Sequence, residues 1–176
     1  MANNNHLIDK YIDALLVEAA LRKNELNSET ITTVYLGGGT PSLLSSTQLS
    51  KLVNGLKKVF DFSDVEEFTI EVNPDDVTPE CIQQSKSLGI NRVSMGVQSF
   101  SDEDLRFINR RHTAKQATDA IHIIKEAGID NISIDLIYGI PGQNFEIWKN
   151  NVDTAILLSV QRISAYTLMY EEGTRL

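Results

Sequence analysis

Residues 67–73 read EFTIEVN, a stretch in which polar side chains alternate with apolar ones. Successive side chains of a β-strand point to opposite faces, so this stretch predicts a strand with one polar and one apolar face. The alternation recurs in VSMGVQ at 93–98, in ISIDL at 132–136 and, more weakly, in RISAY at 162–166. The chain therefore holds a set of strands with matching polar faces.

Helical patterns separate these strands. We expect helices at 6–26, 46–60, 79–88, 102–109, 114–127 and 144–158, and strands at 31–36, 67–72, 91–97, 131–138 and 162–168. Ser45 with Gln48, and Thr113 with Gln116, fit the capping box that opens a helix. Strands that alternate with helices call for an α/β fold with a parallel sheet, and right-handed crossovers place the helices outside a single curved layer.

The polar face of this sheet predicts a functional site. Glu71, Gln98 and Asp135 share the polar parity of their strands near the strands' C-terminal ends. Burying a carboxylate is costly unless it binds something. The strand at 31–36 runs into glycines 37–39 and Thr40, and glycines at the end of a strand let a ligand approach the backbone. Ligands of β/α barrels bind at this end of the strands, so we expect one concave face to collect all these groups.

Bulk properties exclude several classes of protein. The net charge of −8 argues against a general nucleic-acid binder, and no apolar run approaches the ~20 residues that would cross a membrane. The N-terminus does not resemble a secretory signal, and the single cysteine, Cys81, suits a reducing cytoplasm. The three histidines lack metal-ligand spacing, so no metal site is expected from this chain's own residues. A cytoplasmic protein of one domain is expected.

Four ordered motifs carry a family resemblance. They are Gly37 to Leu44, Glu71 to Pro74, Ser94 to Phe100 and Ile134 to Gly142. Together they resemble the core of radical S-adenosylmethionine (SAM) proteins, in particular the oxygen-independent coproporphyrinogen III oxidases and their heme-chaperone relatives. The resemblance implies a partial (β/α)6 barrel in which this chain supplies strands two to six. Residues 1–176 would then be a partial radical SAM core domain, with the cluster-binding first strand and the C-terminal domain absent.

The resemblance also implies nine residues that contact SAM. They are Gly38, Gly39, Thr40, Glu71, Gln98, Arg110, Asp135, Ile137 and Tyr166. The glycine motif would hold the methionine amino group, with Glu71 close to it. Arg110 would grip the ligand's carboxylate, and Asp135 would accept the ribose hydroxyls. Ile137 and Tyr166 would pack near the adenine.

The implied cofactors are SAM and a 4Fe-4S cluster. The family holds its cluster with three cysteines in a Cys-x3-Cys-x2-Cys loop, and one cysteine at position 81 cannot replace them. The cluster ligands would therefore lie outside this chain, and we expect the fragment alone to be inactive. Without the first strand, the edge of the strand at 31–36 is open, which predicts a homodimer or marginal solubility.

The resemblance leaves two functions open. A heme chaperone would bind heme and pass it to an acceptor protein. A true oxidase would use an electron donor, cleave SAM to a radical and convert propionates of coproporphyrinogen III to vinyl groups, giving protoporphyrinogen IX. Three segments look more like the chaperone branch: Gly39 to Leu44, Asn109 to His112 and Tyr170 to Thr174.

Plainer interpretations also remain for several residues. Arg110 to His112 could simply complement the C-terminal end of the short helix at 102–109. Glu71 could be the structural partner of a buried base, and Tyr166 could belong to the barrel core. Trp148, with Phe145, Val152 and Ile156, predicts a buried stripe of the helix at 144–158. An ordinary β/α barrel enzyme with a phosphorylated substrate would keep the fold but leave the two carboxylates unexplained.

Overall fold

The computed structural model describes residues 5–27, 29–169 and 173. Its helices are α1 (Asn5–Arg22), α2 (Ser46–Val59), α3 (Pro79–Ser87), α4 (Asp102–Phe107), α5 (Ala114–Glu126) and α6 (Phe145–Leu157). Its strands are β1 (Thr33–Leu36), β2 (Glu67–Val72), β3 (Arg92–Gln98), β4 (Asn131–Tyr138) and β5 (Arg162–Thr167). Three short 3₁₀ turns, η1 (Lys23–Leu26), η2 (Pro41–Leu43) and η3 (Pro74–Asp76), complete the described elements. Every predicted element is present, with small differences at the ends.

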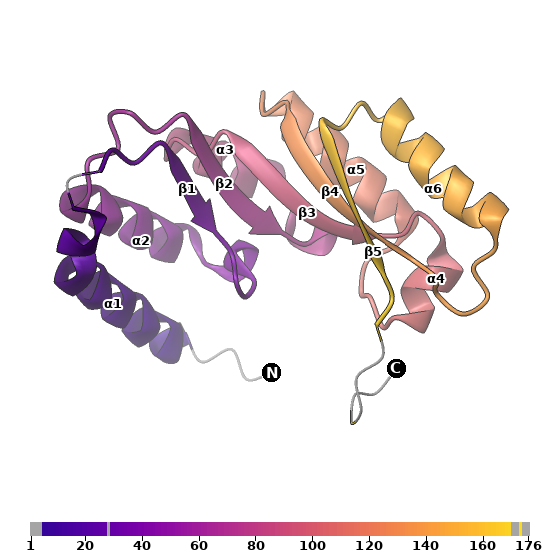
Figure 1. The fold of residues 1–176 in the computed structure, drawn as a ribbon, viewed down its shortest axis with the longest axis horizontal. Helices are drawn as coiled ribbons and strands as arrows, with labels where there is room; N and C mark the ends of the chain where they lie inside the picture. Colours follow the sequence, from indigo (N-terminus) through magenta and orange to yellow (C-terminus); the bar gives the residue numbers. More distant parts are fainter. Residues whose placement is uncertain (1–4, 28, 170–172, 174–176) are drawn as a thin grey trace.

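The five strands form one open parallel sheet in the order β1-β2-β3-β4-β5. Figure 1 shows the strands side by side along a curved layer, with α2, α3, α5 and α6 distributed along its outer side. Sequential parallel strands with helices outside are the arrangement of a partial β/α barrel. The predicted fold class is therefore confirmed, and the sheet is not closed.

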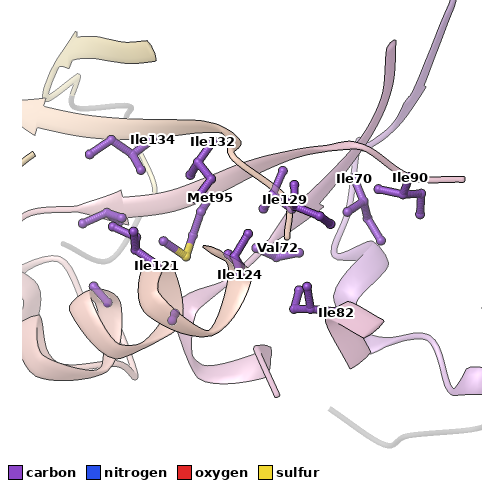
Figure 2. Close-up of a cluster of buried hydrophobic side chains, with 14 of the residues drawn as sticks. Ile70, Val72, Ile82, Ile90, Met95, Ile121, Ile124, Ile129, Ile132 and Ile134 are labelled. Carbon is purple, nitrogen blue, oxygen red and sulfur yellow. The ribbon is translucent and has the colours of Figure 1, made fainter. Parts of the chain in front are cut away.

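The hydrophobic core lies between the sheet and these helices. Figure 2 shows Ile132 and Ile134 of β4 and Met95 of β3 above Ile121 and Ile124 of α5. All five side chains are fully buried. The strand residues are the apolar members of the alternating pattern, so their burial turns the polar members to the opposite, concave face. The core thus fixes which side of the sheet carries the candidate site.

Two helices begin at the capping residues that the sequence predicts. Ser45 and Gln48 form both bonds of a capping box at the start of α2. Thr113 and Gln116 do the same at the start of α5. Each box satisfies two backbone N–H groups that a helix end would otherwise leave unpaired.

The predicted buried stripe of α6 is only partly correct. Trp148 packs against the hydrophobic core, but Phe145 and Ile156 are 73% and 63% exposed. Asn151, which the apolar pattern does not include, is fully buried. Its side chain bonds to the segment that follows β3, where its Oδ1 accepts from the Phe100 N–H at 2.7 Å. A hydrophobic pattern alone does not register such a bond.

Two further observations concern membrane-spanning helices and the C-terminal segment. None of the helices in the described part of the chain is long and apolar enough to cross a membrane. Of the segment Tyr170 to Thr174, which favoured the chaperone branch, all but Gly173 lie outside the described residues.

Candidate ligand-binding site

Polar side chains of neighbouring strands lie beside one another on the concave face. Glu71 of β2 is in register with Ser94 of β3, and Asp135 of β4 is in register with Ser164 of β5. Residues in register on adjacent strands share a face of the sheet. Glu71 and Asp135 are half-buried near the C-terminal ends of their strands, as predicted.

A cavity of about 300 Å³ opens at this end of the sheet. Its lining residues are Gly39, Thr40, Glu71, Val72, Asn73, Ser94, Gly96, Gln98, Arg110 and Asp135. Six of the nine predicted site residues therefore meet at one cavity. Gly38 lies beside it and bonds to Glu71. Ile137 and Tyr166 are paired in register two residues beyond the pair of Asp135 and Ser164 on β4 and β5. The prediction that Glu71, Gln98 and Asp135 share one concave face with the glycine loop is confirmed.

Glu71 joins the glycine loop to the sheet. The Tyr35 hydroxyl donates to one carboxylate oxygen at 2.7 Å, and the Gly38 N–H donates to the other at 3.2 Å. A Cβ on Gly37 would lie 2.7 Å from this carboxylate, so the loop passes too close for a larger residue. Each carboxylate oxygen can accept a second hydrogen bond, so Glu71 keeps capacity for a ligand.

Arg110 reaches the cavity from the loop after α4. Its Nη2 donates to the Gly96 carbonyl at 3.2 Å, so the guanidinium points to β3 and not to the end of α4. Its Nε is buried without a hydrogen-bond partner among the described residues. Burial lowers the pKa of Arg110, an effect that Asp75 opposes. A buried, unused N–H of a guanidinium is suited to an acceptor supplied by a ligand.

Gly96 makes room for two of the site's side chains. A Cβ at this position would lie 2.8 Å from Nη2 of Arg110 and 2.9 Å from Nε2 of Gln98. Both contacts are far closer than side chains tolerate. The bare backbone of β3 is therefore what lets an arginine and a glutamine lie together over the sheet.

The surroundings of Asp135 shift the pKa of its carboxyl group in opposite directions. Burial raises the pKa of its carboxyl group above the ordinary value, while a hydrogen bond with the Ser164 side chain opposes the shift. The neighbouring charge of Glu71 adds to the rise, and Arg110 reduces it. Holding a carboxylate in this environment costs free energy, which a ligand that donates hydrogen bonds to it would offset.

An ion pair ties together the loops around the cavity. Arg111 contacts Asp75 at 2.8 Å, and Ser42 donates to Asp76 at 2.8 Å. These bonds link the loops that follow β1, β2 and α4. The Arg111 side chain is 68% exposed, so the pair contributes geometry more than stability.

The described residues offer no group of three or more His, Cys, Asp or Glu side chains that could hold a metal ion. Cys81 is half-buried near the start of α3, and burial raises the pKa of its thiol. A thiol with a raised pKa is a poor metal ligand, because metals bind the thiolate.

The polar faces predicted from the alternation include Asn73, Ser94 and Gly96, and all three line the cavity. Tyr35 was given no role, although its hydroxyl bonds to Glu71. The sequence carries no direct signal for this contact, because it depends on how β1 pairs with β2.

Comparisons with known proteins agree with this geometry. Residues 5–155 match the Radical SAM superfamily. The heme chaperone HemW of Lactococcus lactis is 40% identical over 167 residues, which cover 95% of this chain and 43% of the relative. HemW of Bacillus subtilis is 37% identical, with coverage of 95% and 44%. The chain thus spans less than half the length of these curated relatives.

A solved structure agrees with the fold. Coproporphyrinogen III oxidase (HemN) from Escherichia coli, described as a radical SAM enzyme, superposes with a TM-score of 0.87 at 30% identity. The match covers 97% of this chain and 39% of HemN. With the superfamily matched over residues 5–155 and the same fold in HemN, this chain belongs to the radical SAM superfamily.

Proposed function

We propose that residues 1–176 are the SAM-binding core of a cytoplasmic radical SAM protein that handles heme, of the chaperone type named HemW. The observation that carries this proposal is the cavity lined by Gly39, Thr40, Glu71, Gln98, Arg110 and Asp135. Its support comes from charge, from unused hydrogen-bonding capacity and from the relatives' names.

The charges of the cavity suit SAM. The ligand carries two positive groups, an ammonium and a sulfonium, and one carboxylate. The cavity lining offers two carboxylates, Glu71 and Asp135, and one guanidinium, Arg110. Charges of opposite sign on the two partners favour binding and orientation. A phosphate group is negatively charged and would meet two carboxylates and one guanidinium in this cavity. The repulsion argues against an ordinary β/α barrel enzyme with a phosphorylated substrate.

Individual residues fit the groups of SAM. In this proposal the unused Nε of Arg110 binds the ligand's carboxylate, and Glu71 with the glycine loop holds its ammonium. Asp135 accepts the ribose hydroxyls, while Ile137 and Tyr166, paired two residues further along β4 and β5, flank the adenine. Gln98 contributes a further polar side chain to the lining of the cavity.

The 4Fe-4S cluster does not fit the residues of this chain, because Cys81 is the sole cysteine and sits in α3. We propose that the cluster ligands belong to a first strand and loop of a longer protein, which also has a C-terminal domain. With cluster and SAM bound, radical SAM cofactors supply a strongly oxidising radical. The residues described here bind and orient SAM, and this chain alone is proposed to be inactive.

Two functions of the longer protein compete. The HemW relatives, at 37–40% identity, favour binding of heme and transfer to an acceptor protein. The similarity to HemN favours oxidation of coproporphyrinogen III with an electron donor. The higher identity to HemW makes the heme chaperone our principal proposal, with coproporphyrinogen dehydrogenase as the alternative.

We expect the full-length protein to bind heme stoichiometrically and to leave coproporphyrinogen III unchanged. Heme binding is measured by absorbance titration, and turnover by chromatography of the porphyrins under anaerobic reducing conditions with SAM. HemN of Escherichia coli serves as the positive control for turnover. Formation of protoporphyrinogen IX by this protein, at a rate near that of the control, would replace the chaperone by the oxidase.

We expect the 176-residue chain to self-associate through β1. Within the described residues, β1 is hydrogen-bonded to β2 alone, so one row of its backbone groups is open. Sedimentation at several protein concentrations tests this, with Thr33→Lys as the variant that places a charge on the edge strand. Wild-type chain that stays monomeric across the concentration range contradicts the prediction.

A further inference from the structure

Gln98 occupies a strained backbone conformation at the end of β3. Its φ is +68°, a value that residues other than glycine rarely adopt. The Ser99 N–H donates to the Val97 carbonyl across it at 2.9 Å, which closes a three-residue γ-turn of the positive-φ kind. Such a conformation persists only where the surrounding structure holds it in place.

The register of β3 shows what this turn does. Met95 pairs with Ile134 and Gln98 pairs with Leu136, so three residue steps on β3 face two on β4. An extra residue of this kind disturbs the alternation of side chains. Leu136 is buried in the apolar core, yet its partner Gln98 lines the polar cavity. The extra residue and the positive φ together account for the direction of Gln98.

A buried polar cluster holds the segment that follows the turn. The Asn151 Oδ1 accepts from the Phe100 N–H at 2.7 Å, and its Nδ2 donates to the Ser99 hydroxyl at 3.0 Å. That hydroxyl donates to Asp104 at 2.7 Å. Asn151 and Ser99 are completely buried and Asp104 nearly so. Buried polar networks whose members are all bonded are rigid and specific.

The same cluster reaches the exit of β4. Gln143 donates to Asp104 at 2.7 Å, and its side-chain oxygen accepts from the Gly139 N–H at 3.0 Å. The Val97 carbonyl, which accepts from the Ser99 N–H in the turn, also bonds to the His112 ring at 3.0 Å. The cluster therefore connects the turn at Gln98 to the loop that follows β4.

We propose that Asn151, together with Ser99 and Asp104, is a positioning residue that clamps the strained turn and thereby aims Gln98 into the cavity. This inference rests on the proposed SAM site for its effect on binding. Asn151 lies on α6, outside the sheet, and does not line the cavity. Its effect on a ligand must therefore pass through Gln98.

The clamp is tested first by stability, without any ligand. Glycine adopts φ near +68° without strain, so Gln98→Gly should raise the melting temperature of the chain by about 2–4 °C. Asn151→Ala should lower it, and should lower it less in the Gln98→Gly background, because the clamp then has less strain to oppose. Asn150→Ala, an exposed neighbour on the same helix, is the matched control and should leave the melting temperature unchanged.

The second test is SAM affinity by calorimetry on the cluster-reconstituted full-length protein. Gln98→Gly should weaken binding about fivefold despite the higher melting temperature, and Asn151→Ala should weaken it by a similar factor. The double variant should bind no more weakly than the weaker single variant. If Asn151→Ala fails to fold alone, the double variant, relieved of strain, provides the comparison with Gln98→Gly.

The outcomes separate the two proposals. A melting temperature that falls for Gln98→Gly, or an Asn151→Ala cost that is equal in both backgrounds, overturns the clamp. Wild-type affinity in a folded Asn151→Ala variant shows that Asn151 is structural only and also overturns it. If the wild-type protein does not bind SAM at all, the proposed function is wrong. The stability measurements still decide in that case whether the turn is clamped.

Discussion

Asp135→Asn is expected to weaken SAM binding roughly ten- to a hundred-fold in the full-length protein. The change keeps the size of the side chain but removes the charge that accepts the ribose hydroxyls in the proposed site. Hydrogen bonds to a charged group contribute about 1.5–3 kcal/mol, which corresponds to this range of affinity. Because Asp135 is half-buried and its pKa is raised by burial, the substitution should not destabilise the fold.

The measurement is calorimetry on cluster-reconstituted protein, with circular dichroism to establish that both proteins fold. Asp130→Asn is a matched control, since Asp130 is exposed and precedes the same strand. The control should bind SAM as the wild type does, because exposed side chains outside a site contribute little. Equal affinities for folded Asp135→Asn and wild type would remove Asp135 from the site and weaken the other assignments taken from the family.

Period-two alternation predicted the sheet and most of the site. In β2 and β4 the apolar members are buried among the helices, and Glu71 and Asp135 consequently face the cavity. Alternation succeeds here because a one-residue slip would bury every polar side chain of the strand. The helices were found equally well, since their capping boxes are local sequence signals.

The failures have a common cause, which is polar contact between segments distant in sequence. Gln98 was placed correctly, but parity does not explain its direction, because β3 carries an extra residue before it. The stripe of α6 was wrong at Phe145 and Ile156, and it missed the buried Asn151, which bonds to Phe100, 51 residues away. Tyr35 was missed because it bonds to Glu71, 36 residues away. Periodicity describes one element at a time and carries no information about such pairs.

Gly96→Ala is expected to cost about a hundredfold in SAM affinity while leaving the protein folded. A methyl group at this position would meet Nη2 of Arg110 and Nε2 of Gln98, so both side chains must leave the positions from which they line the cavity. The atoms that must move are the far ends of flexible side chains, which can shift without disturbing the backbone of β3. Two ligand contacts, one of them charge-assisted, would be lost together.

The route of this effect can be measured with a double variant. If Gly96→Ala acts by displacing Arg110 and Gln98, it should weaken SAM binding much less once Arg110 has been replaced by alanine, because one of the two clashes is gone. Equal losses in both backgrounds would mean that the methyl group blocks the ligand itself. Gly96→Ala with wild-type affinity and an unchanged melting temperature would show that neither side chain needs its observed position. The cavity would then be unable to account for SAM binding, because Arg110 supplies the one positive charge among its lining residues.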